Sequence, residues 1–325
     1  MHASYDAFVT ATLFEKAGGA AFALGDGAVR FESGESVNAH EGAILCAVAH
    51  PSGEGVVTGG DDGRLVWSRS GSDPIMLASA KGRWIDAAAS NPVSGLIAFG
   101  AGRELRVLDV ADPAFVRVFP HEKSVAAIDL DAKGRRIAVA TYGGTALWYA
   151  RIAEQKPQFL RWAGSHIGVL FSPDGRFLMS AMQENQLHGW RMADSKDMRM
   201  GGYPSKVKSM AFMARGMLLA TAGAPGVVVW PFGGANGPMG KEASEIGFDE
   251  SALVARVAGS PDGTILAAGL DDGRVWACDL TSRRLETIKA EKGAAISALA
   301  LSADGARLAW GDEDGGVGVV ELPAL

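Results

Sequence analysis

One stretch of the chain decides its fold. It begins with the turn SPDG (260–263), continues through the apolar run TILAAG (264–269) and the turn DDG (271–273), and ends with RVWACDL (274–280). Proline presets one backbone φ angle of a tight turn, and glycine allows the positive φ angle of another. Asp-Gly between two apolar runs is the strongest short-range hairpin signal. The stretch therefore predicts antiparallel strands joined by tight turns.

The same pattern returns along the chain, at 51–67, 172–192 and 302–322. Hairpin units that repeat with a period of about 40 residues are typical of a β-propeller. No linker divides the sequence, so we expect an all-β fold in which residues 1–325 form a single domain of four-stranded antiparallel blades. Eight units can be counted by their innermost strands, which we place at Val9–Phe14, Ile44–His50, Ile85–Ser90, Val125–Asp131, Ile167–Ser172, Val207–Phe212, Val254–Ser260 and Ile296–Ser302.

The number of blades depends on how the ring closes. The last unit ends at Leu325, soon after its third strand, and the residues before Val9 are few and weakly β-prone. We therefore favour eight blades with an imperfect closure. The alternative is seven blades, in which the first unit, Val9–Asn38, is divided between closing the ring and capping it.

The repeats resemble those of the WD40 family. Residues 171–190 and 260–279 come closest, because the family's usual unit has the SPDG turn, a second strand, an Asp-Gly turn and then Trp-Asp. No unit carries both of the family's Gly-His and Trp-Asp pairs. We therefore expect the family's buried His–Ser–Asp–Trp hydrogen-bond set to be mostly absent, with apolar packing taking its place. The resemblance implies a non-catalytic platform that binds a protein or peptide partner.

Composition excludes several classes of protein. Apolar residues make up 48% of the chain, so a large core is available, and the net charge of −6 argues against general binding of nucleic acid. Cys46 and Cys278 lie in predicted strands far apart and are expected to be buried free thiols of a reducing compartment. The first 16 residues lack the apolar core of a secretion signal, and no run is long enough to span a membrane. We expect a cytoplasmic protein without a membrane partner.

Motifs for catalysis or for a cofactor are missing from the sequence. It contains no Gly-x-Ser-x-Gly elbow, no paired His or Cys at zinc-binding spacing, and no phosphate loop before a helix. We therefore expect no cofactor and no enzymatic activity. The competing hypothesis is a metal-dependent propeller hydrolase or lactonase with its site in the central channel. Asp86 and Asp129, on neighbouring inner strands, would be its first ligands.

Three histidines stand just before innermost strands, where the WD40 family places the histidine of its Gly-His pair: His40, His121 and His166. The interpretation we favour is a histidine that forms hydrogen bonds within its own blade. The alternative is a set of histidines around the rim of the channel, where two or three could meet a ligand or metal.

Charged residues suggest a binding surface. The loops that lead into the innermost strands lie on the same face as the turns between second and third strands, and we call this the top face. Aspartate in such a turn is also favoured by backbone geometry alone. However, acidic residues gather in units seven, eight, one and two, and basic residues in units three, four and six, which would orient a partner.

Exposed aromatics serve as anchors in interfaces. The expected binding residues are Trp84, Lys81, Arg83, Tyr142, Lys123, Asp61, Asp62, Asp271, Asp272 and Asp312. A rival site is the glycine-rich loop Pro231–Gly247 on the opposite face.

Overall fold

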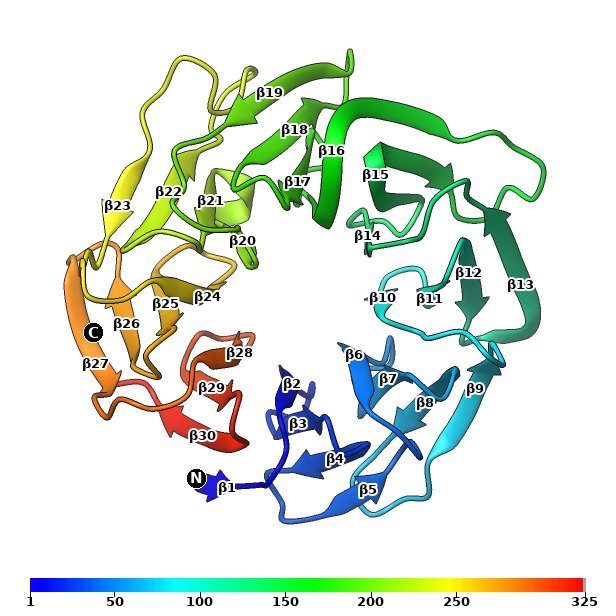
Figure 1. Ribbon diagram of the computed structural model, residues 1–325, viewed down its shortest axis with the longest axis horizontal. Helices are drawn as coiled ribbons and strands as arrows, with labels where there is room; N and C mark the ends of the chain where they lie inside the picture. The colour runs from blue at the N-terminus through cyan, green and yellow to red at the C-terminus, as the bar shows by residue number, and fades with distance from the viewer. Residues whose placement is uncertain (324–325) are drawn as a thin grey trace.

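The strands expected from the repeated turns are present, and they radiate from a central channel (Figure 1). The computed structural model describes residues 1–323. Within them, the regular elements are strands, apart from the single 3-10 turn η1 (Ala214–Gly216). Every pair of neighbouring strands is antiparallel, as hairpin connections require. The fold is therefore an all-β propeller, as predicted.

Six of the sheets have four strands each. Their strands are β2 (Val9–Phe14), β3 (Ala20–Leu24), β4 (Ala28–Phe31) and β5 (Ser36–Asn38); β6 (Ile44–Ala49), β7 (Val56–Gly60), β8 (Arg64–Ser68) and β9 (Ile75–Ser79); β10 (Ala87–Asn91), β11 (Leu96–Ala101), β12 (Glu104–Asp109) and β13 (Asp112–Pro120); β20 (Met210–Met213), β21 (Leu218–Thr221), β22 (Val227–Pro231) and β23 (Ser244–Ile246); β24 (Val254–Gly259), β25 (Ile265–Leu270), β26 (Val275–Asp279) and β27 (Arg284–Lys289); and β28 (Ile296–Leu301), β29 (Arg307–Asp312), β30 (Gly316–Glu321) and β1 (His2–Ser4).

The seventh sheet has six strands and contains two of the sequence units. Its strands are β14 (Ala127–Leu130), β15 (Arg136–Tyr149), β16 (Gln158–Phe171), β17 (Phe177–Met182), β18 (Leu187–Arg191) and β19 (Lys196–Met200). The long strands β15 and β16 each change partner halfway along, so that β16 pairs first with β15 and then, from His166, with β17. Counted by sheets, the propeller has seven blades, as in the alternative. All eight expected innermost strands are nevertheless present, because the six-stranded sheet supplies two of them.

The ring closes completely, which corrects the expectation of an imperfect closure. Strand β1 pairs with β30 over three residues, with Ala3 opposite Val317. The amino group of Met1 donates to the carbonyl of Val319 at 2.7 Å. Backbone groups make this junction, so the weak β-propensity of the side chains did not prevent it. The first unit is also intact: β2–β5 form a sheet of their own rather than being divided between closure and capping.

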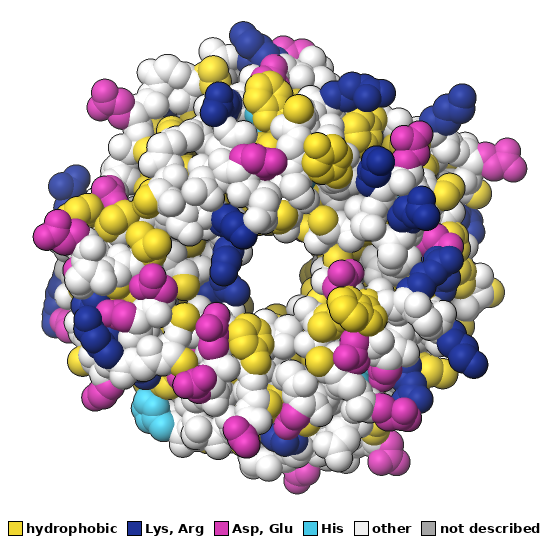
Figure 2. Space-filling model, viewed as in Figure 1, with side chains coloured by type: hydrophobic (Ala, Val, Ile, Leu, Met, Phe, Trp, Pro, Cys, Tyr) yellow, Lys and Arg dark blue, Asp and Glu magenta, His cyan; other side chains and the backbone are white. Residues whose placement is uncertain are grey.

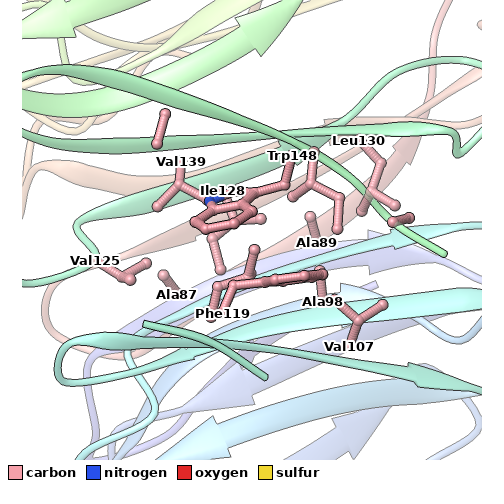
Figure 3. Close-up of a cluster of buried hydrophobic side chains, with 14 of the residues drawn as sticks. Ala87, Ala89, Ala98, Val107, Phe119, Val125, Ile128, Leu130, Val139 and Trp148 are labelled. Carbon is pink, nitrogen blue, oxygen red and sulfur yellow. The ribbon is translucent and has the colours of Figure 1, made fainter. Parts of the chain in front are cut away.

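The core lies between the sheets. Figure 3 shows one such layer, in which Phe119 and Trp148 stack with their ring centroids 4.6 Å apart beside small residues such as Ala87 and Ala89. Small side chains on the inner strands allow neighbouring sheets to converge on the axis. Polar ones join the sheets near the channel: the Thr10 hydroxyl donates to the carbonyl of Ile44, and the Ser297 hydroxyl to that of Val9.

Buried hydrogen-bond sets are better preserved than the degenerate repeats suggested. In the second unit, His40 bonds to Asp62 at 3.0 Å and to Thr58 at 2.8 Å. In the fifth unit, His166 bonds to Ser180 at 2.7 Å.

The sixth unit keeps the same arrangement with a different residue. Tyr203 stands in the place of the histidine, where its hydroxyl bonds to Thr221 and accepts from the Trp230 indole, both at 2.7 Å. Tyrosine can replace histidine here because one hydroxyl both donates and accepts.

Candidate interaction site on the top face

Each loop that leads into an inner strand lies across the turn of the preceding sheet. The amide of Ala80 donates to the carbonyl of Gly63 at 2.7 Å, and the amide of Ile85 donates to that of Gly60 at 3.0 Å. Gly63 has a φ angle of +75°, and a Cβ atom there would lie 2.7 Å from the Ala80 carbonyl oxygen, so glycine is required. This contact brings the loop with Lys81, Arg83 and Trp84 beside the turn with Asp61 and Asp62.

Several of the expected acidic binding residues already have hydrogen-bond or ion-pair partners within the protein. Asp271 accepts from the amide of Leu253 at 2.9 Å, and Asp272 pairs with Arg274 at 2.8 Å and with Lys292 at 3.2 Å. Asp312 is buried and accepts from the amide of Gly316 at 2.7 Å. These contacts match the structural interpretation of aspartates in turns.

Asp62 and Asp61 differ in exposure. Burial would raise the pKa of Asp62, but hydrogen bonds from His40 and two backbone amides hold this pKa below its usual value. Asp61 is exposed. Acidic side chains gather over the lower blades of the face in Figure 2, while basic ones are frequent over the right and upper blades.

Two of the expected anchors are strongly exposed. The exposed fraction is 64% for Trp84 and 65% for Tyr142. Arg83, in contrast, forms an ion pair with Glu104 at 2.6 Å and therefore already has a partner in its own blade. Exposed side chains of this size are the kind that bury well against a partner.

Two further exposed aromatics on the top face were missed in the sequence. Phe8 and Phe248 lie in the loops before β2 and β24 and are 44% and 63% exposed. The signal for Phe8 was available, because Phe8-Val9 has the same order as Trp84-Ile85: an aromatic residue directly before a buried aliphatic one.

A cleft of about 460 Å³ lies between the loop before β14 and the strands β15 and β16. It brings together the expected residues Lys123 and Tyr142 with three others, His121, Phe159 and Arg161. The guanidinium of Arg161 lies 5.4 Å from the ring centroid of Phe159. The sequence did not single out Phe159 or Arg161, because they come beside Tyr142 only when β15 and β16 pair.

A bulge in β15 forms one wall of this cleft. The register shifts between Tyr142 and Gly144, and Gly144 has a φ angle of +148°. A Cβ atom at Gly144 would lie 2.2 Å from the carbonyl oxygen of Leu160, so no other residue fits there.

The charge of the cleft at neutral pH is set by its lysine and arginine. Nε2 of His121 accepts from the Trp148 indole at 3.2 Å, and burial lowers the pKa of His121 to about 4. This histidine is therefore neutral. Among the residues that line the cleft, Lys123 and Arg161 are positively charged and Glu122 is the one acidic residue. The net charge of the cleft is therefore positive.

Asp86 and Asp129, the two aspartates of the competing hypothesis, have different surroundings. One carboxylate oxygen of Asp129 accepts from the amide of Phe171 at 2.7 Å, which joins β14 to β16. Burial raises the pKa of Asp86 and that of Asp129, the latter to about 7. Within residues 1–323, no three His, Cys, Asp or Glu side chains are arranged to hold a metal ion.

The rival loop Pro231–Gly247 packs on the neighbouring sheet. Arg176 donates to the carbonyl of Gly234, and Arg191 donates to the side chain of Asn236. In the described part of the chain, no helix is both long and apolar enough to cross a membrane.

Comparisons with known proteins agree with the fold. The family model "WD domain, G-beta repeat" matches residues 32–67, which contain the bonded residues His40, Thr58 and Asp62. The resemblance to WD40 repeats is thus confirmed for this unit. No curated protein sequence matches the chain.

Two solved structures share the arrangement. The computationally designed Ika8 protein is 19% identical, with a TM-score of 0.78 and 98% of both chains covered. The β-propeller domain of Cps50 (Swd1) from Myceliophteria thermophila is 12% identical, with a TM-score of 0.68 over 86% of this chain and 96% of that one. At these identities, the likeness shows the fold alone.

Proposed function

We propose that this WD40-type propeller acts as one domain and as a non-catalytic interaction platform, whose top face binds a protein or peptide. WD40 propellers commonly serve in this way, and the degenerate repeats leave the scaffold intact. The observation that carries the proposal is the exposure of Trp84 and Tyr142, each about two-thirds exposed on the same face. The free thiols Cys46 and Cys278 favour the cytoplasm as the compartment, because thiols stay reduced there.

The proposed binding surface has two parts. One is the Trp84 loop, with the exposed Lys81 and Asp61 beside it. The other is the basic cleft formed by Lys123, Tyr142 and their neighbours. A partner segment that carries acidic and apolar side chains suits the cleft, since its carboxylates would meet Lys123 and Arg161 while its apolar groups cover the aromatic rings.

The experiment compares top-face variants with a matched control. Affinity capture from cells of the source identifies candidate partners, and calorimetry with the purified partner then measures binding to wild type, Trp84→Ala and Tyr142→Ala. The control is Tyr149→Ala, because Tyr149 is the last residue of the same strand, β15, seven residues beyond Tyr142, and is 56% exposed.

We expect each top-face variant to weaken binding by about 2 kcal/mol, or about 30-fold, while the control stays within about twofold. The proposal fails if Tyr149→Ala weakens binding as much as the other two variants, or if neither top-face variant changes it. Arg83 is left unchanged, because its ion pair with Glu104 would be lost as well.

A further inference from the structure

The channel carries an uneven distribution of charge. Its cavity, of about 440 Å³, is lined mainly by small and apolar residues of the inner strands, together with hydroxyl groups such as those of Thr10 and Ser297. Of the residues that line it, the charged ones are Lys208, two residues before β20, and Arg256 in β24. Figure 2 shows basic side chains beside the channel on that side.

Lys208 and Arg256 also line a side cavity of about 290 Å³ that extends between the innermost strands β16 and β20. Gly168 of β16 opens this space because it has no side chain: a Cβ atom there would lie 3.3 Å from Ala181 and 3.8 Å from Met210. The remaining walls are largely apolar and include Ile167 and Val207. The lining of this cavity therefore combines two cations with apolar side chains.

Arg256 is held in place by backbone carbonyls and not by a carboxylate. Its Nε donates to the carbonyl of Ser297 at 2.6 Å, and Nη1 donates to that of Ala255 at 3.1 Å. Arg136, which is also partly buried, pairs instead with the carboxylate of Asp131 at 2.8 Å. Burial lowers the pKa of Arg256, and the charge of Glu313 opposes this. A guanidinium fixed in this way is preorganised to bind an anion.

We propose that the side cavity between β16 and β20 binds a small organic carboxylate, with its anionic group at Lys208 and Arg256 and its apolar part against Ile167, Val207 and Met210. Two cations and the nearby Glu313 leave one positive charge in excess, which matches a monoanion. The apolar interior selects a ligand with a short hydrocarbon part over a bare ion. This site is separate from the proposed binding surface on the top face and does not depend on it.

The test uses three probes that separate charge from apolar contact. Hexanoate carries both features, acetate carries the charge alone, and hexanol carries the hydrocarbon alone. Each is titrated into the full chain at low ionic strength and followed by calorimetry. We expect saturable binding of hexanoate, at least about tenfold tighter than either of the other two, because four methylene groups and one charge-assisted contact contribute separately.

Variants locate the binding site. Lys208→Gln and Arg256→Gln are each expected to weaken hexanoate binding about tenfold, which is the loss of one hydrogen bond to a charged group. Arg103→Gln removes the same charge from an exposed turn of the top face and is expected to change binding less than about twofold. Lys208 is exposed, so its variant remains decisive even if Arg256→Gln loosens the contact with Ser297.

Several outcomes would overturn the proposal. Hexanoate that shows no saturable binding, or binds no better than acetate, removes the cavity as the site. An effect of Arg103→Gln equal to that of Lys208→Gln would show diffuse attraction to surface charge instead of a site.

Discussion

Replacing Asp129 with asparagine should stabilise the protein above neutral pH. Asp129 lies on the inner strand β14, and burial raises the pKa of its carboxyl group from 3.8 to about 7. The folded chain therefore keeps this proton to a higher pH than the unfolded chain does. As pH rises from about 4 to about 7, the unfolded state releases its proton first, so stability falls across that window. Asparagine removes the charge and keeps an oxygen that can accept from the amide of Phe171.

The magnitude follows from the size of the shift. About three pKa units correspond to about 4 kcal/mol at pH 8, and contact of this half-buried residue with solvent lowers the effect to about 2 kcal/mol. The free energy of unfolding, measured by urea denaturation at pH 8, should therefore be about 2 kcal/mol higher for Asp129→Asn than for wild type. At pH 4 the two proteins should be nearly equal, because the wild-type carboxyl is then neutral in the folded state.

Asp131, two residues further along, provides a control of opposite sign. It is buried, accepts from the amide of Arg135 at 2.8 Å and pairs with Arg136 at 2.8 Å. Asp131→Asn breaks the ion pair and should destabilise the protein by about 1–3 kcal/mol at pH 8. The reasoning about Asp129 is refuted if its variant is no more stable than wild type at pH 8, or if a gain seen there persists unchanged at pH 4.

Three other predictions test the fold. Tyr203→Phe removes the hydroxyl that joins Thr221 to Trp230 and should lower the free energy of unfolding by about 1–3 kcal/mol in urea denaturation; an unchanged midpoint would mean that the hydroxyl contributes nothing. Deletion of residues 1–7 removes β1 and leaves β30 as an open edge, so size-exclusion chromatography should show aggregation and the urea midpoint should fall, whereas a monomer of wild-type stability would argue against closure by β1. Cys278 is buried as expected, whereas Cys46 is only partly buried. Desolvation raises the pKa of Cys46 to about 12 and also raises that of Cys278, so both thiols should react slowly with a disulfide reagent at pH 8 and quickly in urea; rapid reaction of the folded protein would contradict the raised pKa values.

The sequence by itself determined the class of fold and the positions of the inner strands. Turns such as SPDG (260–263) and DDG (271–273) can adopt few backbone conformations, and the apolar runs between them vary little in length. Local chemistry of this kind is read directly from the residues. The predicted range Val9–Phe14 is the observed β2 without change, and Val254–Ser260 differs from β24 by one residue.

The sequence did not reveal how units join. β15 runs through two strands of the fourth unit, and β16 continues from the fourth unit into the fifth; both follow from bulges near Gly144 and Gly168, where the pairing register shifts. Likewise, β1 pairs with β30 through backbone groups, which carry no residue-specific signal. Pairing between distant segments is a tertiary property.

For the candidate site, too, the sequence determined one part and the tertiary structure the other. The sequence indicated that Trp84 and Tyr142 lie in loops or turns of one face, because the order of strands in a blade decides on which face each connection emerges. Only the tertiary structure decided which of the charges near them already have partners: Arg83 is paired with Glu104, while Lys123 shares a cleft with Arg161. An ion pair depends on the distance between two side chains that the fold brings together, and that distance is not encoded in either residue alone.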